Sequence, residues 1–180
     1  MEITFLGAAQ EVTGSCHRLR VGDKSVLLDF GMFQGRRAES QEKNEDLPFS
    51  LDEIDAVILS HAHIDHSGRL PLLARRGFDR PVYATPATRD LCAVMLADSA
   101  HIQEKDAEFL ARRHKTFAQP LYEQADVTRL MRRMISIPYN VPFDPAPGIR
   151  ATFVEAGHIL GSASVVLECA EGDKRRRLVF

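Results

Sequence analysis

The sequence predicts an α/β fold, and three observations support this class. Short apolar runs typical of strands occur near both ends of the chain, while helical patterns fill the middle, as in sheets covered by helices. Residues 56–59 form a continuous apolar run, which is typical of a strand buried on both faces. The chain is 44% hydrophobic and 27% charged, the balance of a globular domain with a core.

The first sixty residues are rich in strand patterns. Residues 3–6 predict a strand that ends at Gly7. Residues 15–21 and 25–30 predict a hairpin, because the Gly-Asp pair between them is a turn signal. Residues 31–44 are polar, and we expect them to form a loop.

Helical patterns begin near residue 66. Leu70, Leu73 and Ala74 fall on one face of a helix, and Gly77 suits the position just past its end. Residues 81–84 then predict a short strand.

A second helix is predicted after residue 85, because Thr85 is a favourable N-cap and Pro86 suits the first helical position. We expect residues 103–120, which are polar, to form an exposed helix and loop. The apolar stripe of the second helix is expected to contain Leu91, Met95 and Ile102.

A third helix is predicted to begin at Asp126, which can cap it. Its apolar residues follow the spacing i, i+3, i+4 and i+7: Val127, Leu130, Met131 and Met134. Four prolines are then expected to break the chain: Pro138, Pro142, Pro145 and Pro147. Residues 149–155 and 162–169 return to strand patterns.

The last three residues, 178–180, have the pattern of a further strand that has only begun. We therefore expect the 180 residues to be the N-terminal portion of a longer protein.

Composition excludes some classes of protein. The formal net charge of -2 argues against a uniformly basic surface, so composition gives no independent sign of RNA binding. No apolar run approaches the roughly 18 residues of a membrane span. The three cysteines are widely spaced and odd in number, which is typical of reduced thiols. We expect a cytoplasmic protein that does not contact a membrane.

The segment most informative about function directly follows the predicted buried strand. His61, His63, Asp65 and His66 fall within six residues there, and imidazole and carboxylate suit a borderline cation such as Zn²⁺. His61 and His63 are two residues apart in an extended loop and can bind one ion, while Asp65 and His66 can reach a second. Two ions about 3.5–4 Å apart can stabilise both the entering and the leaving oxygen of a displacement.

Two residues elsewhere in the chain are predicted to complete this site. His158 stands between glycines at the end of a strand, where backbone can approach a ligand closely, and we predict that it binds the ion of His61 and His63. Asp29 ends an apolar strand, and its carboxylate can accept hydrogen bonds from the histidine loop and orient it. At this position an Asn is expected to loosen the metal less than an Ala.

The sequence resembles a known family. Residues 61–66 resemble the HxHxDH signature of the metallo-β-lactamase fold, and residues 7–15, 28–35 and 157–163 resemble motifs of its β-CASP branch of RNA- and DNA-processing nucleases. This resemblance implies an αββα sandwich with two zinc ions between its sheets. Residues 1–180 would then be an incomplete metallo-β-lactamase-like domain, its N-terminal half, with the continuation and the β-CASP insert beyond residue 180.

The resemblance also implies the reaction, which is zinc-dependent cleavage of RNA phosphodiester bonds by the complete protein. His61, His63 and His158 would hold one zinc ion and Asp65 and His66 the other. The residues implied to carry catalysis are Asp65, His66 and Asp29. The family's bridging aspartate and final histidine have no match here, so the isolated chain is expected to be weak or inactive. The resemblance leaves the oligomeric state open, with a homodimer as one option.

Three other hypotheses about the function are considered. Another hydrolase of the same fold, such as a thioesterase, lactonase or lactamase, is disfavoured by residues 32–35 and 157–163. A diiron redox enzyme would carry glutamate in place of His63. The third hypothesis is that the chain is a non-catalytic fragment that binds metal weakly. Zinc stoichiometry separates it from an enzyme, which would hold two ions tightly.

Overall fold

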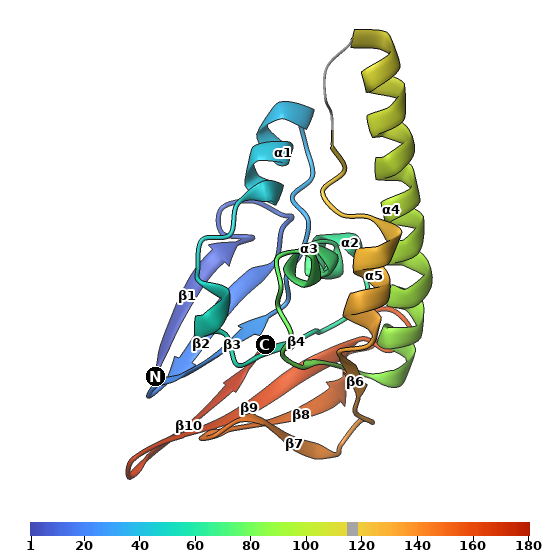
Figure 1. Ribbon diagram of the computed structural model, residues 1–180. Coiled ribbons are helices and arrows are strands. Elements are labelled where there is room, and N and C mark those ends of the chain that lie inside the picture. Colours follow the sequence, from blue (N-terminus) through green and yellow to red (C-terminus); the bar gives the residue numbers. More distant parts are fainter. Residues whose placement is uncertain (115–118) are drawn as a thin grey trace.

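The computed structural model describes residues 1–114 and 119–180 of the chain, and its strands form two sheets (Figure 1). The first sheet contains β1 (Glu2–Gly7), β2 (Cys16–Val21), β3 (Lys24–Leu28), β4 (Ala56–Ile58), β5 (Val82–Ala84) and β6 (Met134–Ser136). The second contains β7 (Pro142–Ala146), β8 (Ile149–Glu155), β9 (Ala163–Glu171) and β10 (Lys174–Val179).

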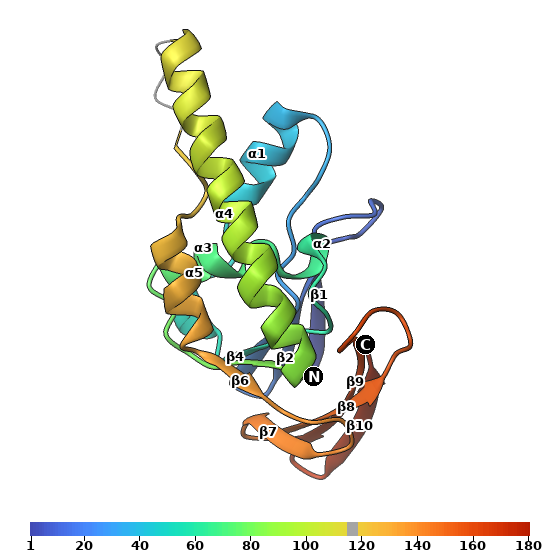
Figure 2. The same ribbon diagram turned by 90° about the vertical axis from the view of Figure 1, so that its right-hand side faces the viewer.

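The helices lie on the side of the first sheet that faces away from the second (Figures 1 and 2). They are α1 (Arg37–Glu45), α2 (Ile64–Ser67), α3 (Leu70–Arg75), α4 (Pro86–His114) and α5 (Gln124–Met131), with a 3₁₀ turn, η1 (Leu51–Glu53). The described residues therefore form three layers, helices on sheet on sheet. They correspond to the α–β–β part of the αββα sandwich that the sequence resemblance implies.

The order of strands in the first sheet decides where the histidine loop lies. The sheet runs β1-β2-β3-β4-β5-β6, antiparallel from β1 to β3 and parallel from β3 to β6. Parallel strands end at the same edge of a sheet, so the residues that follow β3, β4 and β5 meet there. Asp29 and the histidine segment are two of these three continuations.

Two apolar clusters stabilise the layers. One joins α3, α4 and α5 to the outer face of the first sheet, with Leu72, Leu96 and Val127 among its buried members. The other fills the space between the two sheets, where Leu28 and Ile58 of the first sheet meet Phe153 and Val165 of the second. The predicted hairpin, the buried strand at 56–59 and the strands at 149–155 and 162–169 are all confirmed, within two residues at their ends.

The prediction of a loop over residues 31–44 was wrong, because α1 begins at Arg37. This helix has no apolar stripe that periodicity could detect. Polar contacts hold it instead. The Asn44 side chain accepts from the Phe33 N–H at 2.8 Å and donates to the Phe33 carbonyl at 2.9 Å. Arg69 donates to the carbonyls of Lys43 and Asp46.

The second predicted helix is α4, and Thr85 accepts a hydrogen bond from the Thr88 N–H as an N-cap does. Ile102 does not belong to its buried stripe and is 53% exposed. The buried positions are four residues apart, at Cys92, Leu96 and Ala100, and Ile102 lies on the opposite side. The expected helix continues to residue 114, and residues 103–113 are exposed or half-buried as expected, whereas residues 115–118 lie outside the described part of the chain.

Three other expectations, for the third helix and the segment after it, were also wrong. Asp126 does not cap α5. Glu123 is its N-cap, and Asp126 lies three residues later in a reciprocal capping box. Met134 belongs to β6 instead of the helix. Pro142 and Pro145 do not break the chain, because they lie in β7, an edge strand that tolerates residues without an N–H.

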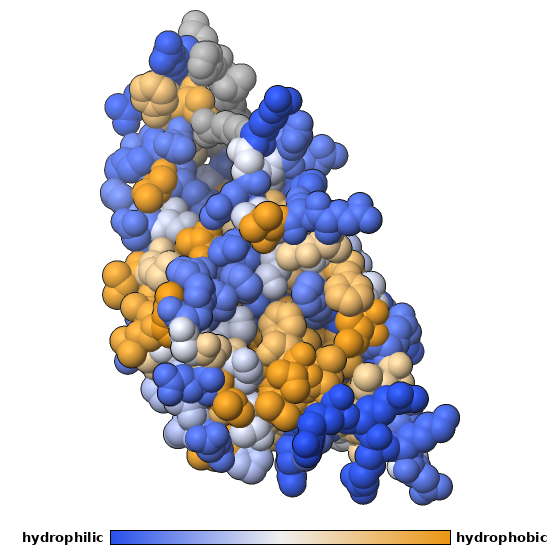
Figure 3. All heavy atoms as spheres, turned by 180° about the vertical axis from the view of Figure 1, so that it is seen from behind, coloured by the Kyte–Doolittle hydropathy of each residue, from blue (hydrophilic) through white to orange (hydrophobic). Residues whose placement is uncertain are grey.

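The surface of the molecule is uneven in polarity. Seen from behind, hydrophilic side chains gather over the tip of the β9–β10 hairpin, and a hydrophobic area lies above it (Figure 3). Residues 174–177 of the hairpin, one Lys and three Arg, are all exposed. None of the described helices is long and apolar enough to cross a membrane.

The cluster between the sheets gives the first testable prediction. The buried Phe153 ring lies 5.1 Å from the ring of Phe143, which in turn lies 4.8 Å from Tyr83 of the first sheet. We expect Phe153→Ala to lower the free energy of unfolding by about 3–5 kcal/mol, as measured by urea denaturation. Phe109→Ala removes a ring that is 57% exposed and should change it by less than about 0.5 kcal/mol. Equal effects of the two substitutions would contradict the assigned core.

Candidate metal centre

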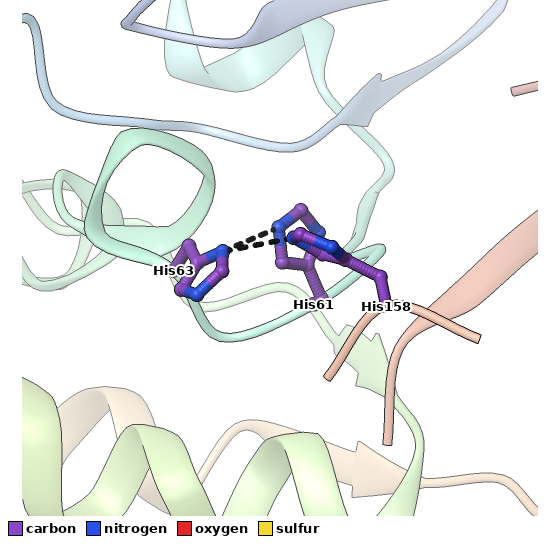
Figure 4. A group of neighbouring side chains, drawn as sticks. All are labelled: His61, His63 and His158. Atoms are coloured by element: carbon purple, nitrogen blue, oxygen red, sulfur yellow. Dashed lines mark hydrogen bonds between the residues drawn. The ribbon is translucent and has the colours of Figure 1, made fainter. Parts of the chain in front are cut away.

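Three histidines from two distant parts of the chain converge at one point. His61 and His63 lie in the segment between β4 and α2, and His158 lies in the turn between β8 and β9 (Figure 4). The Nδ1 atom of His63 is 3.2 Å from Nε2 of His61 and 3.2 Å from Nε2 of His158. One ring nitrogen from each residue lies within 4.8 Å of the other two. The structure thus brings together the three residues that the sequence predicted as ligands of one ion.

The site has a buried and an open side. His61 is buried, His63 is half-buried and His158 is exposed. Burial, with a smaller contribution from the charge of His66, lowers the pKa of His61 from 6.5 to about 4. His61 is therefore neutral at pH 7, which is the form that binds metal.

Asp29 lies beneath the histidine segment and is completely buried. Its Oδ1 accepts from the Ser60 N–H at 2.8 Å. Its Oδ2 accepts from the hydroxyls of Ser60 at 2.9 Å and Ser15 at 3.1 Å, and from Nδ1 of His66 at 2.6 Å. Four donors, three from the histidine segment and one from Ser15, therefore point at one carboxylate, as expected of a residue that orients the histidine loop.

These hydrogen bonds determine which nitrogen of each ring carries the proton. The Ser60 hydroxyl donates its one proton to Asp29, so at its 2.9 Å contact with Nδ1 of His61 it must accept. His61 then carries its proton on Nδ1 and presents a bare Nε2 to the cluster. His66 donates from Nδ1 to Asp29, so its Nε2 is also the nitrogen left for a ligand.

His66 and Asp65 form a second group beside the first. Nε2 of His66 lies 3.7 Å from the Asp65 carboxylate, and its ring centroid is 4.0 Å from that of His61. Burial opposes protonation of His66, but the hydrogen bond and charge of Asp29 and the charge of Asp65 outweigh it and hold its pKa above 6.5. Asp65 and His66 thus lie where a second ion could contact both.

Backbone hydrogen bonds clamp the segment after β3 against the histidine segment. The N–H groups of Phe30 and Met32 donate to the carbonyls of His66 and Ile64, at 2.9 Å each. Gly31 lies between them, and a Cβ at this position would be 1.6 Å from the Asp65 carbonyl oxygen. Only glycine therefore allows the close approach that brings Asp29 under the histidines.

The converging nitrogens fit a cation better than a hydrogen-bonded chain. Nε2 of His61 is a bare lone pair, and His63 faces both neighbours with the same Nδ1 atom, which carries at most one proton. A cation can accept all three lone pairs at once. The donor set of three imidazoles is one that transition metals bind.

Sequence reasoning missed two members of this site. Ser15 and Ser60 connect Asp29 to the rest of the network, yet neither residue type in isolation signals such a role. Ser60 could have been found from its place directly before His61, next to the predicted strand end. Ser15 is brought to the site only by the pairing of β1, β2 and β3, which no local pattern shows.

Comparisons with known proteins place these residues in a wider context. Residues 9–173 match the family model described as "Metallo-beta-lactamase superfamily". The chain is 39% identical over 177 residues to "Ribonuclease TTHA0252" of Thermus thermophilus, covering 97% of this chain and 36% of that protein. It is 36% identical over 172 residues to "Transcription termination factor FttA" of Methanocaldococcus jannaschii, covering 96% and 26%. The chain spans about a quarter to a third of the length of these curated relatives.

Solved structures share the fold at lower identity. The Rm3 metallo-beta-lactamase superimposes with a TM-score of 0.58 at 22% identity, covering 98% of this chain and 57% of that one. The subclass B3 metallo-beta-lactamase BJP-1 of Bradyrhizobium japonicum gives 0.57 at 14% identity, covering 99% and 58%. At these identities the likeness concerns the fold alone.

The Asp29 network predicts an order of substitutions that differs from the expectation based on sequence. In Asp29→Asn, the amide oxygen can still accept from the Ser60 N–H. The amide NH₂ then faces Nδ1 of His66 and the Ser60 hydroxyl, where the carboxylate had an accepting oxygen. His66, and through the Ser60 hydroxyl also His61, would then have to carry the proton on Nε2, which is the nitrogen needed for metal. We expect Asp29→Asn to weaken metal binding about 10–100-fold, at least as much as Asp29→Ala, in calorimetric titrations.

The matched control is Asp55→Asn. Asp55 also accepts from a backbone N–H, that of Ser25, but contacts none of the histidines. It should leave metal affinity unchanged. If Asp29→Asn bound metal with wild-type affinity, the Asp29 carboxylate would not determine which nitrogen of His61 and His66 carries the proton.

Proposed function

Because the chain belongs to the metallo-beta-lactamase superfamily, we propose that in its complete form it is a zinc-dependent metallohydrolase of the β-CASP branch, which cleaves RNA. The observation that carries the metal part of this proposal is the spacing of the histidine nitrogens. Three nitrogens at about 2.0–2.1 Å from a tetrahedral Zn²⁺ lie about 3.3 Å apart. The two contacts of His63 with His61 and His158 measure 3.2 Å.

We propose His61, His63 and His158 as ligands of the first zinc ion, and Asp65 and His66 as ligands of a second. Bound zinc supplies Lewis-acid polarisation of a phosphate oxygen and offsets the charge that develops in the displacement. Zinc prefers four ligands, so the second ion needs more than the two side chains named here. We propose that this further ligand comes from outside residues 1–180, because the chain spans only about a quarter to a third of the length of its curated relatives.

The contribution of the chain's own residues follows from their hydrogen bonds. Asp29 holds His66 by its Nδ1 and, through Ser60, holds His61 in the same tautomer. This keeps two ligand nitrogens unprotonated and fixed in direction before substrate arrives. The half-buried Asp65 carboxylate lies 3.7 Å from Nε2 of His66 and keeps part of its surface open to a phosphodiester.

The RNA part of the proposal rests on two observations. Residues 7–15, 28–35 and 157–163 carry the β-CASP motifs, and the curated relatives at 36–39% identity are a ribonuclease and a transcription termination factor. The lactamase structures resemble this chain only in fold. All three cysteines are free and buried, which agrees with the reducing cytoplasm that we propose as its location.

A chimaera tests the proposal directly. The part of this chain that aligns with the Thermus ribonuclease, 97% of its residues, replaces the matching part of that protein, and labelled RNA is the substrate. We expect zinc-dependent cleavage that a chelator stops, whereas the isolated chain binds zinc but cuts weakly. In the chimaera, Asp65→Ala should reduce cleavage by at least about 10²-fold, because it removes a direct ligand.

His101→Ala in the same chimaera is the control, since His101 is exposed on α4 outside the histidine cluster. A folded chimaera that hydrolyses a cephalosporin or a thioester and leaves RNA intact would refute the proposed substrate. A chimaera that cuts RNA equally well after extraction of all metal would refute the metal centre.

A further inference from the structure

The turn that carries His158 is attached to the beginning of α4. The hydroxyls of Thr85 and Thr88 both donate to the Gly161 carbonyl oxygen, at 2.6 and 2.9 Å. Thr85 is 1% exposed and Thr88 is completely buried. One carbonyl thus has both lone pairs occupied by buried hydroxyls from the first turn of a helix.

The contact between the turn and the helix leaves no spare room. A Cβ on Gly161 would lie 2.5 Å from the Thr88 backbone nitrogen and 2.9 Å from Cβ of Ala87. Gly161 also has a φ of +83°, a conformation that favours glycine. The position of the turn is therefore set by direct contact with α4 as well as by the two hydrogen bonds.

The same turn determines where His158 lies. The hydroxyl of Ser162 accepts from the N–H groups of His158 and Ile159, at 3.1 and 3.2 Å, which closes residues 158–162 into one unit. The Ser162 carbonyl accepts from the hydroxyl of Tyr139. His158 itself is exposed, and among the described residues its ring makes a polar contact with His63 alone. Its place beside His61 and His63 thus depends on the backbone of the turn.

We infer that Thr85 and Thr88 are positioning residues of the metal centre, which hold His158 in register with His61 and His63 through the Gly161 carbonyl. This inference rests on the proposed zinc site and adds α4 to the elements that build it. Thr85 also caps the N-terminus of α4, whereas the Thr88 hydroxyl, among the described residues, bonds to the turn alone. Thr88 is therefore the cleaner residue to test.

The test compares Thr88→Val, which keeps the shape but removes the hydroxyl, with Thr88→Ser, which restores it. Zinc affinity of the chain is measured by calorimetry and folding by thermal denaturation. We expect Thr88→Val to bind the first zinc ion about 10-fold more weakly while it remains folded, and Thr88→Ser to stay close to wild type. Gly161→Ala should weaken zinc in the same way with both hydroxyls intact, since its Cβ pushes the turn off the helix.

The control is Thr128→Val. Thr128 lies on α5, and within the described part of the chain its hydroxyl bonds only inside its own helix, to the Gln124 carbonyl. It should not change zinc affinity. Wild-type zinc affinity in both Thr88→Val and Gly161→Ala would overturn the inference and leave the proposed function standing.

A second readout works without metal. Amide hydrogen exchange is followed at Ser162, which donates to Ile159, and at Ala163, which donates to Ser60. We expect exchange at both to be several-fold faster in Thr88→Val than in wild type or Thr88→Ser. Unchanged exchange rates in Thr88→Val would overturn the inference whatever the zinc affinity. If the wild-type chain binds no zinc, the proposed metal centre fails, and the role of the two threonines as its positioning residues fails with it.

Discussion

The site depends on one buried carboxylate and the donors that surround it. Asp29 has no exposed surface and accepts four hydrogen bonds, so its charge is compensated entirely by donors from the histidine segment and from Ser15. Burying a charge is costly unless such partners are present. The same bonds that compensate Asp29 also fix the protons of His61 and His66. The same hydrogen bonds thus stabilise the buried charge of Asp29 and leave Nε2 of His61 and His66 free to bind metal.

The fold brings this arrangement about by ending parallel strands at one edge. Asp29 follows β3, the histidine segment follows β4, and Thr85 follows β5, so three neighbouring strands deliver their next residues to the same place. Asp29 itself has a φ of +59°, a left-handed conformation that aspartate tolerates better than most residues. The second sheet contributes His158 from the turn that connects β8 to β9. The metal centre therefore lies where the two sheets and α4 meet.

Much of this could be predicted from sequence, and the exceptions have physical causes. Most of the strands and α3 were predicted because apolar patterns report burial, but β6 and β7 were missed, since Met134 fitted the helical spacing before it and β7 contains two prolines. The histidine cluster was predicted because imidazole and carboxylate groups at this spacing suit a metal ion. Helix α1 was missed since polar contacts to Asn44 and Arg69 hold it, and these leave no periodic pattern. The attachment of Gly161 to Thr88 joins residues 73 positions apart. Only the folded chain shows such contacts.

The protonation of the two rings tests the central claim most directly. Long-range ¹H–¹⁵N NMR of the metal-free chain reports which nitrogen of each histidine carries the proton. The spectrum is recorded above the raised pKa of His66, so that both rings are neutral. The hydrogen bonds of Asp29 and Ser60 require the proton on Nδ1 in both His61 and His66. Protons on Nε2 of either ring would contradict the account, because that nitrogen could not then meet a metal ion.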